Sequence, residues 1–177
     1  KTSAQSVDAY AKENGMQKGE SGQIQYITVD GFGKTKLSLG DDKNKTGVYT
    51  LEFNLVNDGS EARAYRVRPY VMTESVSADG KTVTEHAYMF NDAKIQVWAD
   101  GETLSGNAVS VRGKSAVKMK VQITLSDADK TYLDEKFENG MLVEGFIHFE
   151  ELNGGDTATD LTIPYVAFWG DWAQAPL

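Results

Sequence analysis

Apolar and polar side chains alternate along most of the chain, which is the pattern of a half-buried β-strand. Every second residue from Tyr49 to Leu55 is apolar, and the neighbours between them are mainly polar. The same alternation runs from Val117 to Leu125. Helical periodicity is nearly absent after Gln23. The pattern therefore predicts strands with one buried and one wet face.

Nine strands are predicted, and turn residues separate them. Asp-Gly pairs begin at Asp30, Asp58, Asp79 and Asp100, and Asn-Gly pairs at Asn139 and Asn153. These pairs tolerate the positive φ of tight hairpins, which connect antiparallel strands. The fold class is therefore all-β, a two-sheet antiparallel Greek-key sandwich. The predicted strands are 24–29, 35–39, 49–55, 64–72, 93–99, 108–111, 117–125, 142–151 and 161–168.

One short helix is predicted over 127–137, where Ser126 or Asp127 can cap the first turn. It lies between two strong strand patterns, so we expect it to cross from one sheet to the other.

The sandwich is assigned to residues 23–173, with an insertion at about 74–92, because a simple immunoglobulin-like sandwich needs only about 100 residues. Residues 1–22 are assigned to an N-terminal appendage or the end of a preceding domain, and 174–177 to a tail.

The composition and net charge of the chain exclude several classes of function. The chain has 177 residues, no cysteine, 18 basic and 26 acidic side chains, and a formal net charge of −8. This balance argues against nucleic-acid binding, and no apolar run approaches the length of a membrane helix. The start at Lys1, without a signal sequence, indicates a mature or excised fragment. The absence of cysteine fits export by a Gram-positive cell and a cytosolic protein equally.

Residues for catalysis or metal binding are scarce. His86 and His148 are the only imidazoles and lie in no recognisable motif, so a catalytic triad is not supported. Sites for soft metals are excluded because the chain has no cysteine and only two distant histidines, so only oxygen ligands for a hard cation remain. We expect no cofactor, with calcium near Asp41 and Asp42 as the alternative, although turn residues also explain that pair.

Aromatic residues are the least ordinary feature. Large aromatics at a domain edge either close the core or anchor another surface, and both interpretations stay open. Ile95 and Val97 share one face of the predicted strand, and Trp98 lies on the opposite face, which favours exposure of its side chain. The candidate domain-interface or binding residues are Tyr88, Phe90, Trp98, Phe168, Trp169 and Trp172.

Six stretches in this order resemble the fibronectin type III-like domain of subtilisin-like cell-envelope serine proteases, the lactocepin and streptococcal complement-cleaving peptidase group. The resemblance covers about 30–172, and its most specific parts are NGMLVEGFI and the LTIPY and FWGDW ending. The stretches are 33–40, 49–57, 125–129, 139–147, 161–165 and 168–172.

The resemblance implies a non-catalytic accessory domain of a secreted, cell-wall-associated enzyme of Gram-positive bacteria. Its implied partners are the protease domain and neighbouring sandwich domains of the same polypeptide, and the parent's protein substrates. No catalytic residue can be transferred, because the subtilisin Asp, His and Ser segments are missing here, so this fragment itself is not expected to be an enzyme.

The alternative function is an extracellular binding or adhesion sandwich that recognises carbohydrate or a surface protein. It would use exposed aromatics such as Trp98, Tyr88 and Trp172. A free-standing enzyme is the least favoured interpretation.

Overall fold

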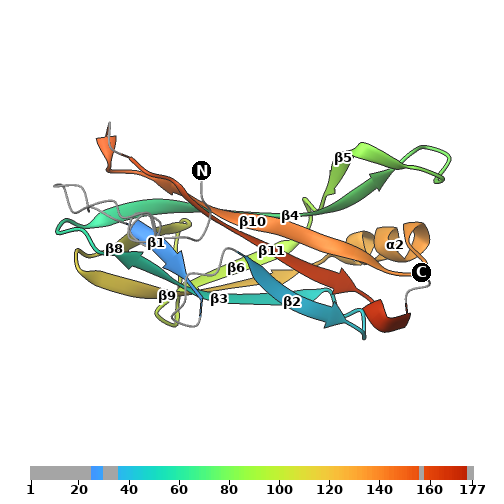
Figure 1. The fold of residues 1–177 in the computed structure, drawn as a ribbon, viewed down its shortest axis with the longest axis horizontal. Coiled ribbons are helices and arrows are strands. Elements are labelled where there is room, and N and C mark those ends of the chain that lie inside the picture. The colour runs from blue at the N-terminus through green and yellow to red at the C-terminus, as the bar shows by residue number, and fades with distance from the viewer. Residues whose placement is uncertain (1–24, 30–35, 156–157, 175–177) are drawn as a thin grey trace, which may run out of the picture.

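A computed structural model describes residues 25–29, 36–155 and 158–174. Two sheets pack face to face as an elongated β-sandwich (Figure 1). The first sheet has the order β1-β3-β9-β6-β7, and the second has the order β2-β11-β10-β4-β5, with β8 also pairing with β4. The strands are β1 (Gln25–Thr28), β2 (Leu37–Asp42), β3 (Val48–Asn57), β4 (Arg63–Val76), β5 (Val83–Met89), β6 (Lys94–Ala99), β7 (Glu102–Thr103), β8 (Ala108–Val111), β9 (Ser115–Thr124), β10 (Met141–Glu151) and β11 (Leu161–Trp169).

The all-β sandwich prediction is confirmed, with one pair that departs from the antiparallel arrangement. β2 pairs with β11 in parallel, with Leu37 opposite Tyr165 and Asp42 opposite Trp169. Alternation shows which face of a strand is buried but not the direction of its neighbour. The structure also adds β5 and β7, which the alternation did not predict.

The core lies between the sheets and is built from the inward side chains of both. Phe53 on β3 meets Phe149 on β10 edge to face, with ring centroids 5.8 Å apart. Tyr65 on β4 packs on Phe149 in the same manner at 6.3 Å. Such perpendicular aromatic pairs add to the gain from burial, so these contacts hold the sheets together.

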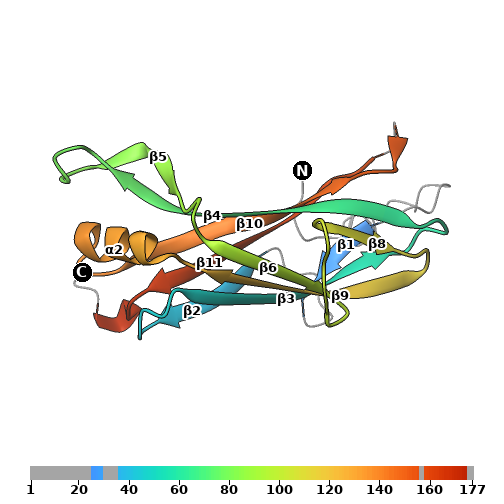
Figure 2. The same cartoon turned by 180° about the vertical axis from the view of Figure 1, so that it is seen from behind.

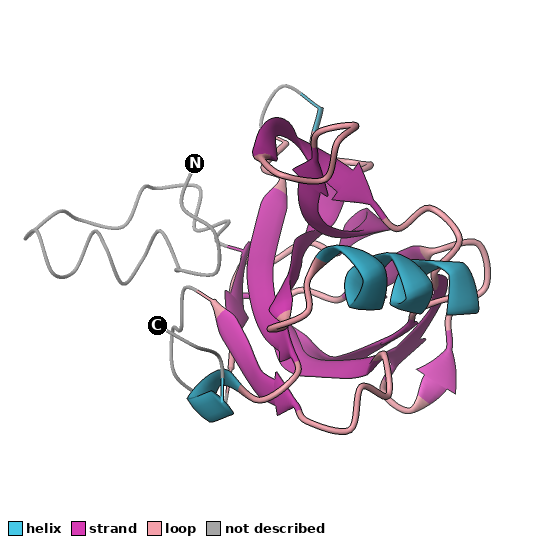
Figure 3. Cartoon of the chain, turned by 90° about the vertical axis from the view of Figure 1, so that its right-hand side faces the viewer, coloured by secondary structure: helices cyan, strands magenta, loops and turns pink. Residues whose placement is uncertain are grey.

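The single α-helix of the described residues, α2 (Asp127–Lys136), joins β9 in the first sheet to β10 in the second, as predicted. Ser126 is the N-cap: its side chain accepts from the amide of Asp129, and the Asp129 side chain accepts from the Ser126 amide. Seen end-on, the helix lies across the end of the sandwich (Figure 3). This reciprocal capping fixes where the helix begins.

The end of β4 and β5 form a hairpin that projects beyond the sandwich at the same end as α2 (Figure 2). It occupies most of the segment 74–92 that the sequence assigned to an insertion. The predicted appendage 1–22 lies outside the described residues, as do 175–177 of the predicted tail. No helix in the described ranges is long and apolar enough to cross a membrane.

Candidate binding surfaces

The structure separates the six predicted aromatics by burial. Phe90, Phe168 and Trp169 are buried, Tyr88 and Trp98 are half-buried, and Trp172 is 62% exposed. The six do not form one surface, because Trp98 lies on the first sheet while Trp172 follows the last strand of the second.

Trp169 belongs to the core. Its indole Nε1 donates a hydrogen bond to Oδ1 of Asp134 on α2 at 3.1 Å, and Lys45 lies over its ring. The Lys45 ammonium also binds the Asp134 carboxylate and holds the pKa of that carboxyl below its usual range. Trp169 therefore joins the end of β11 to the helix and presents no surface to a partner.

Tyr88 connects the projecting hairpin to the helix. Its ring stacks on that of Tyr132 with centroids 3.7 Å apart, and Phe90 meets it edge to face at 5.4 Å. The Tyr132 hydroxyl also donates to the carbonyl oxygen of Glu74. These contacts fix the hairpin against α2 and leave Tyr88 half-buried.

An apolar patch lies on the outer face of the second sheet and ends at Trp172. Leu142 pairs with Phe168 across β10 and β11, and the Phe168 ring meets Trp172 edge to face at 4.9 Å. Leu142 is 39% exposed. With Val166 these side chains line a shallow depression of about 250 Å³. We call this set, Leu142, Val166, Phe168 and Trp172, the Trp172 patch.

The chain holds Trp172 in place through its backbone. Gly170 turns the chain with φ of +121°, which favours glycine, and its amide donates to the carbonyl oxygen of Asp42. The Trp172 amide then donates to Oδ2 of Asp41 at the start of the short 3-10 turn η2 (Trp172–Gln174). These bonds anchor the backbone at Trp172, and the contact with Phe168 orients its exposed indole.

Asp41 and Asp42, the alternative calcium site, both take part in hydrogen bonds of this region. Asp42 accepts from the amides of Thr46 and Gly47, and so closes the turn from β2 to β3. In the described ranges no three His, Cys, Asp or Glu side chains gather as metal ligands. The observed role of both carboxylates is to order turns.

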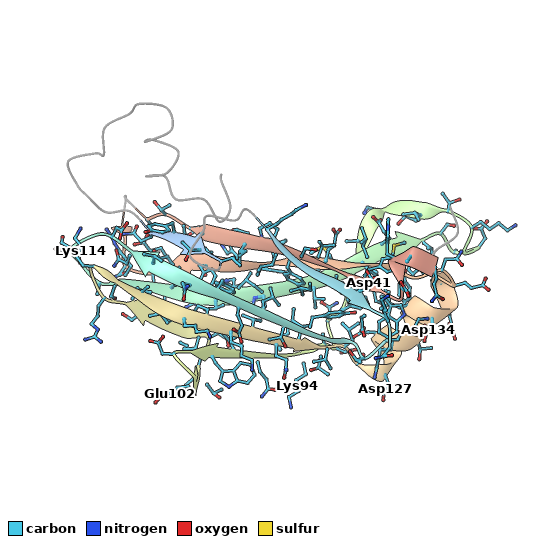
Figure 4. The ribbon with its side chains drawn as sticks, turned by 60° about the horizontal axis from the view of Figure 1, so that its bottom comes forward. Asp41, Lys94, Glu102, Lys114, Asp127 and Asp134 are labelled. Atoms are coloured by element: carbon cyan, nitrogen blue, oxygen red, sulfur yellow. The ribbon has the colours of Figure 1, made fainter. Side chains whose placement is uncertain are left out.

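A polar depression of about 470 Å³ borders the Trp172 patch. Its lining includes Lys43, Asn139, Asp171 and Gln174. Lys43 lies 3.0 Å from Asp171 and holds the pKa of that carboxyl below its usual range. An apolar patch beside a hydrated charged rim is the usual anatomy of a protein–protein contact. Asp41 and Asp134 lie at this end of the sandwich, with Lys114 at the opposite end (Figure 4).

A second surface lies on the outer face of the first sheet, around Trp98. Trp98 on β6 pairs with Lys120 on β9, which pairs with Glu52 on β3. The Lys120 ammonium lies 5.0 Å from the centroid of the Trp98 ring. Together with Gly101 and Lys118 these residues line a depression of about 220 Å³.

A neighbouring depression of about 320 Å³ shares Glu52 and Lys118 with the first and adds Asn54. The two depressions thus follow one another from β6 over β9 to β3. We call the surface formed by Glu52, Asn54, Trp98, Lys118 and Lys120 the Trp98 groove.

The two histidines lie on different strands, and His148 on β10 is half-buried. Nδ1 of His148 lies 3.1 Å from Oγ1 of Thr162, and its Nε2 lies 3.6 Å from a carboxylate oxygen of Asp160. These contacts lie on the outer face of β10 and β11. His86 is on the projecting β5.

The model of the Fn3-like domain family matches residues 37–166. The chain therefore belongs to the Fn3-like domain family. No curated protein matches it.

Several solved structures are similar to this Fn3-like domain at low sequence identity. The ASH/PapD-like domain of human CEP192 (PapD-like domain 7) has 12% identity and a TM-score of 0.50, over 88% of this chain and 91% of that one. The secreted serine protease VesC from Vibrio cholerae has 10% identity and a TM-score of 0.38, over 84% of this chain and 23% of that one. The E. coli chaperone DraB has 10% identity and a TM-score of 0.40, over 84% and 56%. The first of these likenesses supports the sandwich fold and nothing beyond it.

Sequence reasoning found the tryptophan of each surface but missed its neighbours. Leu142 and Val166 were assigned only to strands, and Lys118 and Lys120 only to a wet face. The strand register could have identified these neighbours, because residues directly opposite one another on adjacent strands share one face of the sheet. Register requires the strand order, which the alternation does not contain.

Proposed function

We propose that this Fn3-like domain is a non-catalytic accessory domain of a secreted, cell-wall-associated subtilisin-like serine protease. It would pack against the protease domain of the same polypeptide and help to place protein substrates. The family membership supports the domain type, and the resemblance of 139–147 and 161–172 to cell-envelope proteases points to this parent.

The single observation that carries the proposal is the Trp172 patch. Trp172 is 62% exposed, its amide is hydrogen-bonded to Asp41, and the amide of Gly170 just before it is bonded to Asp42. It therefore exposes apolar area on an anchored backbone, which a partner can bury at a lower ordering cost. Tryptophan is enriched among the residues that dominate binding energy at protein interfaces, and truncation of such a residue often costs about 2 kcal/mol or more, on the order of thirtyfold in affinity. The adjacent polar depression would form the rim of the contact.

The first test is to read the coding sequence upstream of Lys1. A subtilisin-type domain with its Asp, His and Ser segments supports the proposal, whereas a signal peptide directly before Lys1 contradicts it. If the protease domain is present, Trp172→Ala in the longer chain should lower the melting temperature of the protease domain and its activity on a folded protein substrate. Trp98→Ala, at the other partly exposed tryptophan, is the matched control and should leave both unchanged.

A second candidate function, binding of carbohydrate or a surface protein, is favoured by one specific observation. Trp98 lies half-exposed at the β6 side of the Trp98 groove, beside Lys118 and Lys120 of β9 and Glu52 of β3. This surface is on the opposite sheet from the Trp172 patch, so the two functions do not compete for the same residues.

A further inference from the structure

We infer that the Trp98 groove binds an oligosaccharide that carries an acidic group. This inference deepens the second candidate function and rests on it. It is independent of the protease proposal, because none of its residues lies in the Trp172 patch.

The first step of the argument is the shape of the groove. Its two depressions share Glu52 and Lys118 and extend over three neighbouring strands. An extended shallow surface on a rigid sheet suits a chain of sugar rings better than a compact ligand, since each depression can take a separate unit. The sheet supplies this rigidity through the continuous pairing of β3 and β9 over ten residues each.

The second step is the chemistry of the outward side chains. Beyond the groove the same face carries Gln96, Gln122 and Thr50 in one row across the three strands. Amides and hydroxyls both donate and accept hydrogen bonds, as sugar hydroxyls do. The Trp98 indole adds an apolar ring face of the kind on which the C–H face of a sugar ring packs, together with a polar edge.

The third step is the charge of the groove. Lys118 is neutralised by Glu52, with Nζ 3.3 Å from the carboxylate. Lys120 faces the ring of Trp98, and among the described residues no carboxylate forms an ion pair with it. The two lysines and Glu52 give the groove a net charge of +1 on a chain of net charge −8, so Lys120 is a local attraction for an anion. The ammonium of Lys120 is therefore assigned to the acidic group of the ligand.

The contact between Lys120 and Trp98 also orients both partners. A cation over an aromatic ring restricts the lysine and the indole to one arrangement, so less freedom is lost when a ligand binds. The groove thus places an aromatic surface and a positive charge side by side, matching a sugar ring and the carboxylate or phosphate attached to it.

The test uses the full chain and a panel of oligosaccharides that carry a uronic acid, a sialic acid or a phosphate, each beside its neutral counterpart. We expect at least one acidic member to bind, with its neutral counterpart at least about tenfold weaker. The carboxylated and phosphorylated arms identify the source of the acid. Binding is followed by titration calorimetry and by shifts of the Trp98 indole resonance in ¹H–¹⁵N NMR spectra.

Matched variants locate the site. Lys120→Gln and Trp98→Ala should each weaken binding at least about tenfold, whereas Trp98→Phe should retain part of it. Lys94→Gln removes one charge from the same sheet outside the groove, and Trp172→Ala removes the exposed tryptophan of the patch; both should bind as the parent does. Thermal melting of each variant shows whether it is folded.

Three results would overturn the inference: no acidic oligosaccharide shifts the Trp98 resonance, neutral and acidic counterparts bind equally, or Trp172→Ala abolishes binding while Trp98→Ala does not. None of them bears on whether the Trp172 patch packs on a protease domain.

Discussion

The hydroxyl of Tyr165 donates a hydrogen bond to the carbonyl oxygen of Tyr70 at 2.7 Å, and the two atoms meet beside the α-carbon of Gly145. Tyr165 on β11 and Val71 on β4 flank Gly145, which lies on β10 between them. The Tyr165 side chain therefore crosses the middle strand and ties its two neighbours together. Burial raises the pKa of the Tyr165 phenol, which keeps the donor protonated.

Gly145→Ala should be severely destabilising. A β-carbon at this position would lie 2.0 Å from the Tyr70 carbonyl oxygen and 2.7 Å from the Tyr165 hydroxyl. The first of these is backbone and cannot rotate away, so we expect a loss of about 3 kcal/mol or more in urea unfolding. Gly40→Ala is the control, because its β-carbon would meet no atom and its φ of +75° alone should cost about 1 kcal/mol. Equal losses in both variants would contradict this account.

Much of the fold was predictable because alternation marks burial directly. The bounds of β8 and the crossover helix follow from the sequence, and the helix cap at Ser126 rests on local chemistry alone. β5 was missed because residues 83–89 lie on a projecting hairpin and lack a regular apolar face. The direction of β2 depends on its neighbour and leaves no mark on its own residues.

The sequence identified the aromatic residues of the candidate surfaces but not which of them are exposed. Trp169 and Trp172 are three residues apart in an aromatic ending, yet one is 1% exposed and the other 62%. The turn at Gly170 and the hydrogen bond of the Trp172 amide to Asp41 decide this difference, and Asp41 is far away in the sequence. Composition alone could not distinguish a core tryptophan from an exposed one.

Glu151→Ala should cost about 3–5 kcal/mol in free energy of unfolding. The Glu151 carboxylate accepts from the guanidinium of Arg63 at 2.8 Å and from the amide of Thr159 at 2.6 Å, and both charged side chains are almost fully buried. Removing the acid leaves a buried cation without its carboxylate. The double variant Arg63→Met, Glu151→Met should recover most of the loss, as measured by urea unfolding. A double variant as unstable as the single one would contradict the electrostatic explanation.

Asp134→Asn should reduce the acid sensitivity of the fold. Lys45, and to a smaller extent the Trp169 indole, hold the folded-state pKa of Asp134 below its usual range. A lowered folded-state pKa adds stability that is fully present above the unfolded value of about 3.9 and is lost as the pH falls through the folded value. Unfolding free energies measured from pH 6 to pH 2 should therefore fall less steeply in the variant. The control Glu135→Gln changes an exposed acid of the same helix for which no ion pair is found among the described residues, so its slope should match the parent's. A parent-like slope in Asp134→Asn would contradict the prediction.

Tyr132→Ala should loosen the projecting hairpin and leave the sandwich intact. The Tyr132 ring stacks on Tyr88 of β5, and an aromatic pair of this kind contributes about 1 kcal/mol. The amides of β5 should therefore exchange with deuterium roughly fivefold faster, while those of β9 in the first sheet keep their protection. Tyr132→Phe keeps the ring but loses the hydrogen bond to Glu74, so it should show a smaller change confined to the same hairpin. Equal acceleration in β5 and β9 would mean that Tyr132 supports the whole domain through α2 and does not specifically anchor the hairpin.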